Sequence, residues 1–122
     1  MSVGKDETTS PVIRAIRWAD SRCKYPISVV MHHRIFEWNV KRSALQTWKT
    51  LQEEQDAPSI LIYLNLRKYE FVIVLKSELK EKLPAHYLQG VSGAFREDLQ
   101  STFYENAIAI TIRTLALTLP KN

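Results

Sequence analysis

Two short apolar runs, separated by two cationic residues, constrain the fold of this chain more than any other feature. The first run is Ser59–Leu66 and the second is Tyr69–Leu75, with Arg67 and Lys68 between them. Two runs of strand length with a minimal polar connection predict an antiparallel β-hairpin over residues 59–75. Arg-Lys differs from the Asn-Gly pair that two-residue turns prefer, so we expect a longer loop.

The hairpin needs partners, because a lone hairpin is unstable in water and continuous apolar runs are typical of strands covered on both faces. Periodicity elsewhere supplies them. It predicts a strand over residues 27–32 and helices over residues 11–23, 38–54, 83–99 and 102–119. We therefore expect an α/β fold: a small mixed sheet with a central β-hairpin (59–75) covered by helices, in the order α-β-α-β-β-α-α.

Local signals support the helix assignments unequally. Ser10-Pro11 is a strong helix start, because serine caps free N–H groups and proline fits the first turn. The segment 102–119 alternates partly like a strand, but its length favours a helix, which Ser101 would cap. Gly90 and Gly93 weaken the preceding helix, and their presence predicts close packing there.

Length and composition predict a single domain. The chain has 122 residues, of which 45% are hydrophobic, so it can bury a core. We expect a disordered tail at 1–10 and one domain at 11–120. The polar first ten residues, the lack of a long apolar run and the single cysteine, Cys23, predict a cytoplasmic protein without a membrane span or a disulfide.

The net charge of +4 is concentrated in the first half of the chain. Residues 1–50 hold nine Lys/Arg and four Asp/Glu, whereas residues 51–122 hold eight and nine. The basic residues are dispersed, and no nucleic-acid-binding motif accompanies them. This pattern favours a solvated basic face over a nucleic-acid site. The adjacent His32 and His33 would point to opposite faces of a strand, which disfavours a shared metal.

Apolar landmarks across residues 12–120 follow the order of a known family. They are Ile13–Asp20, Ile27–Val30, Ile60–Leu64, Phe71–Val74, Leu83-Pro84 with Tyr87-Leu88, Phe95-Arg96 and Leu119-Pro120. In this order they resemble the TPM domain family, which includes thylakoid lumen acid-phosphatase-like proteins and bacterial envelope proteins. The resemblance implies an α/β fold, an acidic site for a divalent cation and phosphatase-like chemistry.

The polar signature of that family is replaced in this chain. Three family motifs have other residues at the corresponding positions here. Thr-Ser-Gly-Glu corresponds to Cys23–Pro26, Arg-Asn-Gly to Ala57–Ser59, and Gly-Asp to Leu75-Lys76. An ammonium group at Lys76 repels a divalent cation, whereas a carboxylate attracts one. We therefore expect no catalytic residue, no bound metal and no cofactor.

Because the apolar landmarks of the family are present and its polar site residues are absent, we expect a non-catalytic module that binds another protein or assists assembly. Its candidate partner-binding residues are Phe36, Trp38, Arg14, Arg17, Lys41 and Arg42. Burial at the edge of the core is the favoured interpretation of the two aromatics, because monomers rarely expose such pairs. The oligomeric state is open, although a strand at 27–32 could pair with a second copy.

Two alternatives remain. The first is a weak hydrolase of phosphate esters that uses Mg²⁺ or Ca²⁺, with Glu78, Glu97, Asp98 and Glu105 as weak candidate ligands. Acidic residues at helix starts more often favour the helix dipole. The second is nucleic-acid binding, which would weaken steeply with salt.

Overall fold

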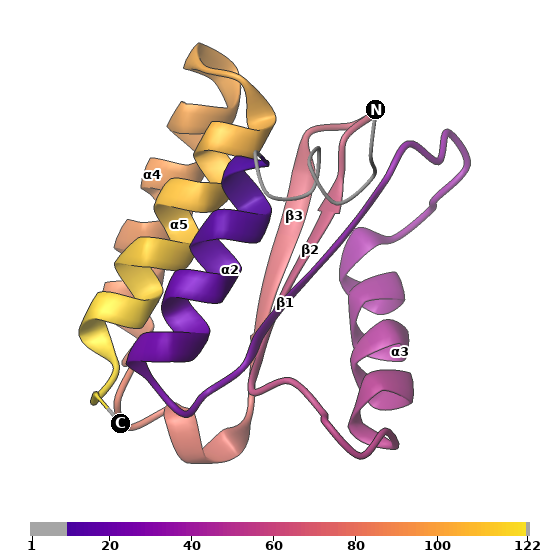
Figure 1. Cartoon of the computed structure of the whole chain (residues 1–122). Helices are drawn as coiled ribbons and strands as arrows, with labels where there is room; N and C mark the ends of the chain where they lie inside the picture. The colour runs from indigo at the N-terminus through magenta and orange to yellow at the C-terminus, as the bar shows by residue number, and fades with distance from the viewer. Residues whose placement is uncertain (1–9, 122) are drawn as a thin grey trace, which may run out of the picture. The chain divides into compact units, whose positions relative to one another are not determined.

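The computed structural model describes residues 10–121, and their elements follow the predicted order (Figure 1). The elements are α2 (Pro11–Arg22), β1 (Ile27–His32), α3 (Val40–Gln52), β2 (Ile60–Asn65), β3 (Glu70–Leu75), the 3-10 helix η1 (Ser77–Leu79), α4 (Ala85–Ser101) and α5 (Tyr104–Thr118). Of the tail expected at 1–10, residues 1–9 lie outside the described residues. Ser10 belongs to the fold, because its hydroxyl caps α2 by accepting from the Ile13 N–H at 3.5 Å.

Residues 25–79 form one compact unit, which contains the sheet. The strand order is β1-β2-β3; β2 pairs parallel with β1 and antiparallel with β3. All six residues of β2 are buried, as its continuous apolar run predicts. The predicted hairpin is therefore present, with β2 at the centre of the sheet and the partly buried β3 at an edge.

Helix α3 packs on one face of this sheet (Figure 1). Its Val40 and Ala44 form a buried cluster with Leu61 and Tyr63, which point to the same face because side chains alternate along a strand. Trp48 packs against this cluster, as its place in the helical periodicity predicts.

The β2–β3 connection is longer than two residues, as expected from its sequence. It is a turn over residues 66–69. The side chain of Asn65 organises it, since its Oδ1 accepts from the Arg67 N–H at 2.9 Å and the Lys68 N–H at 3.2 Å. Tyr69 closes the turn with a φ of 55°, a left-handed conformation that costs free energy for a residue with a Cβ.

Residues 10–24 and 80–121 contribute the second compact unit, which consists of α2, α4 and α5. Helix α5 contacts both α2 and α4. The residues buried on it are mostly alanine, isoleucine and leucine, which suits packing between two helices. None of the helices within residues 10–121 is long and apolar enough to cross a membrane.

Two local expectations in the helical unit are wrong. Ser101 does not cap α5: it is the last residue of α4, and its hydroxyl donates to the Glu97 carbonyl, while Phe103 occupies the α5 N-cap. Gly90 and Gly93 do not mark close packing either, because a Cβ at each position would meet nothing within 4 Å. A glycine can persist in an exposed helix at a modest cost, so its presence alone is weak evidence of a contact.

Candidate functional site

One end of the sheet gathers segments that differ from the polar signature of the family that the sequence resembles. The Ser59 N–H donates to the Pro26 carbonyl at 2.8 Å, and the Lys76 N–H donates to the Ser59 carbonyl at 2.9 Å. The nearest acidic candidate in the chain is Glu78, which is exposed in η1. Within residues 10–121, no group of three or more His, Cys, Asp and Glu side chains could hold a metal ion.

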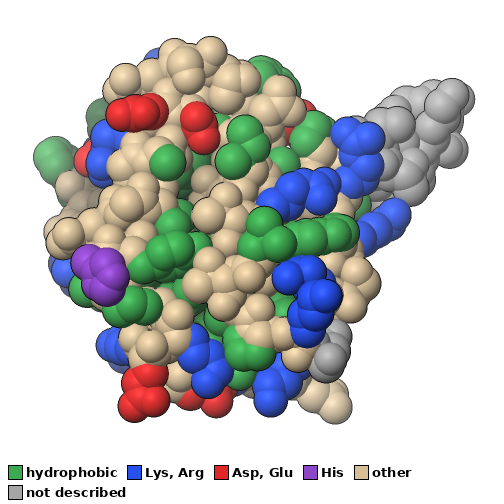
Figure 2. Space-filling view, turned by 90° about the vertical axis from the view of Figure 1, so that its left-hand side faces the viewer, with side chains coloured by type: hydrophobic (Ala, Val, Ile, Leu, Met, Phe, Trp, Pro, Cys, Tyr) green, Lys and Arg blue, Asp and Glu red, His purple; other side chains and the backbone are tan. Residues whose placement is uncertain are grey.

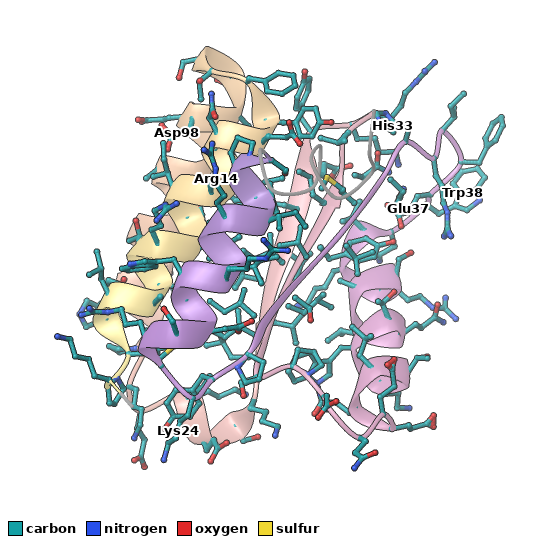
Figure 3. All side chains as sticks on the ribbon, viewed as in Figure 1. Arg14, Lys24, His33, Glu37, Trp38 and Asp98 are labelled. Carbon is teal, nitrogen blue, oxygen red and sulfur yellow. The ribbon has the colours of Figure 1, made fainter. Side chains whose placement is uncertain are left out.

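The other acidic candidates occupy two different helices. Glu97 and Asp98 lie near the C-terminal end of α4, where Figure 3 labels Asp98, and Glu105 lies in the first turn of α5. Only Glu105 is therefore at a helix start, where its charge complements the helix dipole. For Glu97 and Asp98 that interpretation is wrong, because the negative end of a helix dipole does not favour carboxylates.

The segment 33–39, which joins β1 to α3 at the opposite end of the sheet, carries the two most exposed large apolar side chains of the sheet-containing unit, Phe36 and Trp38. Ile35 is 55% exposed, Phe36 84% and Trp38 94%. The expectation that Phe36 and Trp38 bury themselves at the core edge is thus wrong. Figure 3 shows Trp38 projecting away from the strands. We call residues 33–39 the β1–α3 loop.

Glu37, between the two aromatics, turns inward. Only 2% of its side chain is exposed. The Tyr63 hydroxyl donates to Glu37 Oε2 at 2.5 Å, and Asn65 Nδ2 donates to Oε1 at 2.8 Å. His32 Nε2 lies 2.7 Å from the Tyr63 hydroxyl and 3.2 Å from Glu37 Oε2. The carboxylate is therefore paired at both oxygens, as a buried charge requires.

Two further hydrogen bonds hold the backbone of the loop, at Arg34 and at Glu37. Asn65 Nδ2 also donates to the Arg34 carbonyl at 3.1 Å, and the Lys68 ammonium donates to the Glu37 carbonyl. Because Asn65 also organises the β2–β3 turn, it joins the β1–α3 loop to that turn. The loop is thus fixed to the sheet by side chains rather than by regular secondary structure.

The hydrogen bonds of His32 indicate its tautomer. The Arg34 N–H donates to Nδ1 at 3.1 Å, so Nδ1 carries no proton. The proton of the neutral ring therefore lies on Nε2, which faces the Tyr63 hydroxyl. In this arrangement the phenol accepts from His32 and donates to Glu37.

Electrostatics agree with an anchoring role. Burial raises the pKa of Glu37, but hydrogen bonds from Tyr63, Asn65 and Ser43 together with the nearby His32 outweigh it, so that the pKa lies below its ordinary value. Burial and the adjacent Glu37 carboxylate raise the pKa of Tyr63 to about 12. An ionised, fully bonded carboxylate beside a protonated phenol is a poor general base or nucleophile.

Two hollows flank the inward turn at Glu37. The larger has a volume of about 330 Å³ and the smaller about 120 Å³. The larger one is lined by Arg34, Phe36, Glu37, Trp38, Asn39, Arg42, Ser43 and Gln46, and the smaller one by Ile35, Phe36, Glu37, Trp38 and Lys68. Concave sites of mixed polarity are typical places for a ligand to bind.

Some of the sequence-predicted partner residues lie together in the sheet-containing unit, and the others belong to the helical unit. Phe36, Trp38 and Arg42 line one hollow, and Lys41 is exposed beside them on α3. Arg14 and Arg17 are exposed on α2 and belong to the helical unit. On the face of that unit in Figure 2, basic side chains lie mostly to one side and hydrophobic side chains interrupt them, so they form no continuous band.

Sequence reasoning missed the buried set of Glu37, Tyr63 and Asn65. A signal was present, because Tyr63 and Asn65 are two residues apart in an otherwise apolar strand and therefore share a face. Two polar side chains on one face of a buried strand need a partner. Their spacing does not indicate that the partner comes from a loop nearly thirty residues earlier.

Comparisons with known proteins give a fold relationship. No family model and no curated protein matches the chain. A similar solved structure is the NMR structure of the BA42 protein from the psychrophilic bacterium Bizionia argentinensis sp. nov., with a TM-score of 0.79 and 18% sequence identity over 93% of this chain and 79% of that one. At this identity the similarity shows a shared fold alone.

Proposed function

We propose that this chain is a divergent TPM-type domain that acts as a non-catalytic protein-interaction or assembly module. Its contact element in this proposal is the β1–α3 loop, residues 33–39, which we now call the docking loop. The observation that carries the proposal is the exposure of Phe36 and Trp38 on either side of the buried Glu37. Large aromatic side chains dominate the binding energy of many protein interfaces. Isolated exposed apolar residues are common, but a cluster of three on one loop is not.

Anchoring of the loop supports this function. A loop that is already fixed loses little conformational entropy when it binds, so more of its contact energy contributes to affinity. Here the buried bonds of Glu37 and Asn65 provide that fixation. The same bonds occupy the Glu37 carboxylate, which supports recognition rather than catalysis as the role of this end of the sheet.

The opposite end of the sheet supports the non-catalytic part of the proposal. Lys76 follows β3 where the TPM family has an aspartate, and its backbone N–H donates a hydrogen bond to the Ser59 carbonyl. Glu78 is the one acidic candidate close to it in sequence. A divalent cation needs several oxygen ligands, and one exposed carboxylate beside an ammonium group is a poor start for such a site.

The proposal includes a cytoplasmic location and a protein rather than a nucleic acid as the partner. Cys23, the single cysteine, is a buried thiol, so the fold does not depend on an oxidising compartment. On the face that Figure 2 shows, hydrophobic side chains interrupt the basic ones, which argues against a phosphate-tracking surface there. A mobility-shift assay at low salt tests the second point, and a clear shift of DNA or RNA would contradict it.

Photo-crosslinking tests the docking role. A photoreactive phenylalanine analogue replaces Trp38 in the full chain, and in a matched control it replaces Leu117, which is 58% exposed on α5. We expect discrete protein adducts from the first position that the second position does not give. Equal adduct patterns from both positions would contradict a docking role for the loop.

A phosphatase assay tests the absence of catalysis. Purified protein is incubated with a chromogenic phosphate ester, with and without Mg²⁺ or Ca²⁺. We expect no metal-stimulated turnover. Turnover that is lost in Glu78→Gln, or in Glu97→Gln combined with Asp98→Asn, would show that the hydrolase alternative is correct.

A further inference from the structure

We propose that the partner of the docking loop is an acidic peptide segment, one carboxylate of which enters the 330 Å³ hollow between Arg34 and Arg42 while a neighbouring apolar side chain packs on Phe36 and Trp38. This inference rests on the proposed function and deepens it, because it names the chemistry of the partner. It follows from three features of the loop region: its charge, the lining of the hollow and the shape of the surface.

The docking loop and the first part of α3 carry mostly positive charges. Residues 31–49 contain four Lys and Arg and a single acidic residue, Glu37. Because the Glu37 carboxylate is buried and bonded to Tyr63 and Asn65, it offers nothing to a partner. The accessible charges of the segment are therefore all positive, and Lys68 adds another at the smaller hollow. Complementary charge favours a negative partner and speeds its association.

The hollow has the donors that a carboxylate needs. Arg34 and Arg42 both line it, and a guanidinium group pairs with a carboxylate in a bidentate geometry. The Oδ1 atom of Asn39 is already hydrogen-bonded, since it accepts from the Arg42 N–H at 3.0 Å and so caps the start of α3. Ser43 and Gln46 complete a polar wall that suits the N–H and C=O groups of a peptide main chain.

The shape favours a peptide over a membrane surface. Phe36 and Trp38 each line both hollows, so the apolar residues of the loop border concave sites that can accept single side chains. Membrane-surface elements instead present a continuous apolar face that is immersed in the interface. A strand or turn of peptide, with alternating acidic and apolar side chains, matches the two neighbouring hollows.

Peptide titrations of the full ¹⁵N-labelled protein test this inference. The probe is a short synthetic peptide in which Asp alternates with Leu and Phe. The controls are one peptide with every Asp replaced by Lys and one with Leu and Phe replaced by Ser. We expect amide shifts in residues 33–46 with the first peptide, weakening as salt rises, and little change with either control.

Matched variants locate the carboxylate. Arg42→Gln is expected to weaken binding of the acidic peptide by about tenfold, which is what loss of a hydrogen bond to a charged group implies. Arg17→Gln, an equal loss of charge on the exposed face of α2, is expected to leave the affinity within about twofold because Arg17 is outside the hollow. Equal effects of the two variants would overturn the proposed site.

The outcomes separate this inference from the proposed function. Failure of the acidic peptide to shift the loop, while the Trp38 crosslinker still gives specific protein adducts, would overturn the acidic partner and leave the docking role intact. Binding of the loop to vesicles of phosphatidylcholine and phosphatidylserine, without binding to the peptide, would also overturn this inference. Loss of specific adducts as well as peptide binding would refute both proposals.

Discussion

Replacing Glu37 with alanine is expected to destabilise the protein although this residue belongs to a surface loop. Most loop substitutions change stability by less than about 0.5 kcal/mol. Glu37 differs because its carboxylate is buried and accepts from Tyr63 at 2.5 Å and from Asn65 at 2.8 Å. The alanine variant removes both acceptors and leaves the two donors in the interior.

The size of the effect follows from those two bonds. A hydrogen bond to a charged group contributes about 1.5–3 kcal/mol to stability. Both side chains stay held by one other hydrogen bond, since the Tyr63 oxygen still accepts from His32 and Asn65 still donates to the Arg34 carbonyl, which favours the lower end of that range. We therefore expect Glu37→Ala to lower the free energy of unfolding by about 3 kcal/mol. Glu37→Gln, which keeps one acceptor oxygen, should lose about half of that.

Urea denaturation followed by circular dichroism measures the difference. Trp38→Ser is the matched control, since Trp38 is the next residue and is 94% exposed, and it should stay within about 0.5 kcal/mol of the wild type. Hydrogen exchange should speed up at residues 33–39 in Glu37→Ala alone. A loss below about 1 kcal/mol, or an equal loss in the control, would refute the anchoring role of Glu37.

Four further predictions rest on single features of the structure. Gly90→Ala and Gly93→Ala should each stabilise α4 by up to about 1 kcal/mol, because a Cβ meets nothing there; a lower melting temperature would contradict this. Tyr69→Asn should stabilise the β2–β3 turn by up to about 1 kcal/mol in urea denaturation, because asparagine tolerates the φ of 55° better. The lowered pKa of Glu37 means that its contribution to stability is present above the ordinary pKa of 4.5 and is lost as pH falls through the folded-state pKa; Glu37→Gln should lack this acid-induced loss. Ultraviolet titration should find one tyrosine with a pKa of about 12 that disappears in Tyr63→Phe, and Tyr63 should cost stability as pH rises from about 10 to 12, because the unfolded chain ionises first.

The sequence predicts the architecture well, because its signals are local. The apolar run that becomes β2 and the helical periodicities of α2 and α3 each identify an element without reference to the rest of the chain. Errors arise where a residue's role depends on distant partners. Ser101 is a good N-cap in isolation, yet α4 extends through it. Nothing in the local pattern near Gly90 indicates whether space beside the helix is filled.

The candidate site is predictable only in part for the same reason. The sequence does identify candidate partner-binding residues here, because an aromatic pair, Phe36 and Trp38, precedes a helix that carries the basic Arg42. Their exposure depends on Glu37, which finds its hydrogen bonds on β2, 26 and 28 positions away. A charged residue between two aromatics normally indicates that the charge faces solvent. Here Glu37 is buried and the two aromatics face outward because of hydrogen bonds to residues that are distant in the sequence.

The most direct test of the account is a comparison of photo-crosslinking from Trp38 and from Leu117 in the full chain, repeated in the Glu37→Ala background. We predict discrete protein adducts from the Trp38 position, none of them shared with the Leu117 position, and a loss of these adducts when Glu37 no longer holds the loop. Indistinguishable adducts from the two positions, or adducts that persist unchanged in Glu37→Ala, would contradict the claim that this chain recognises a partner through an anchored docking loop.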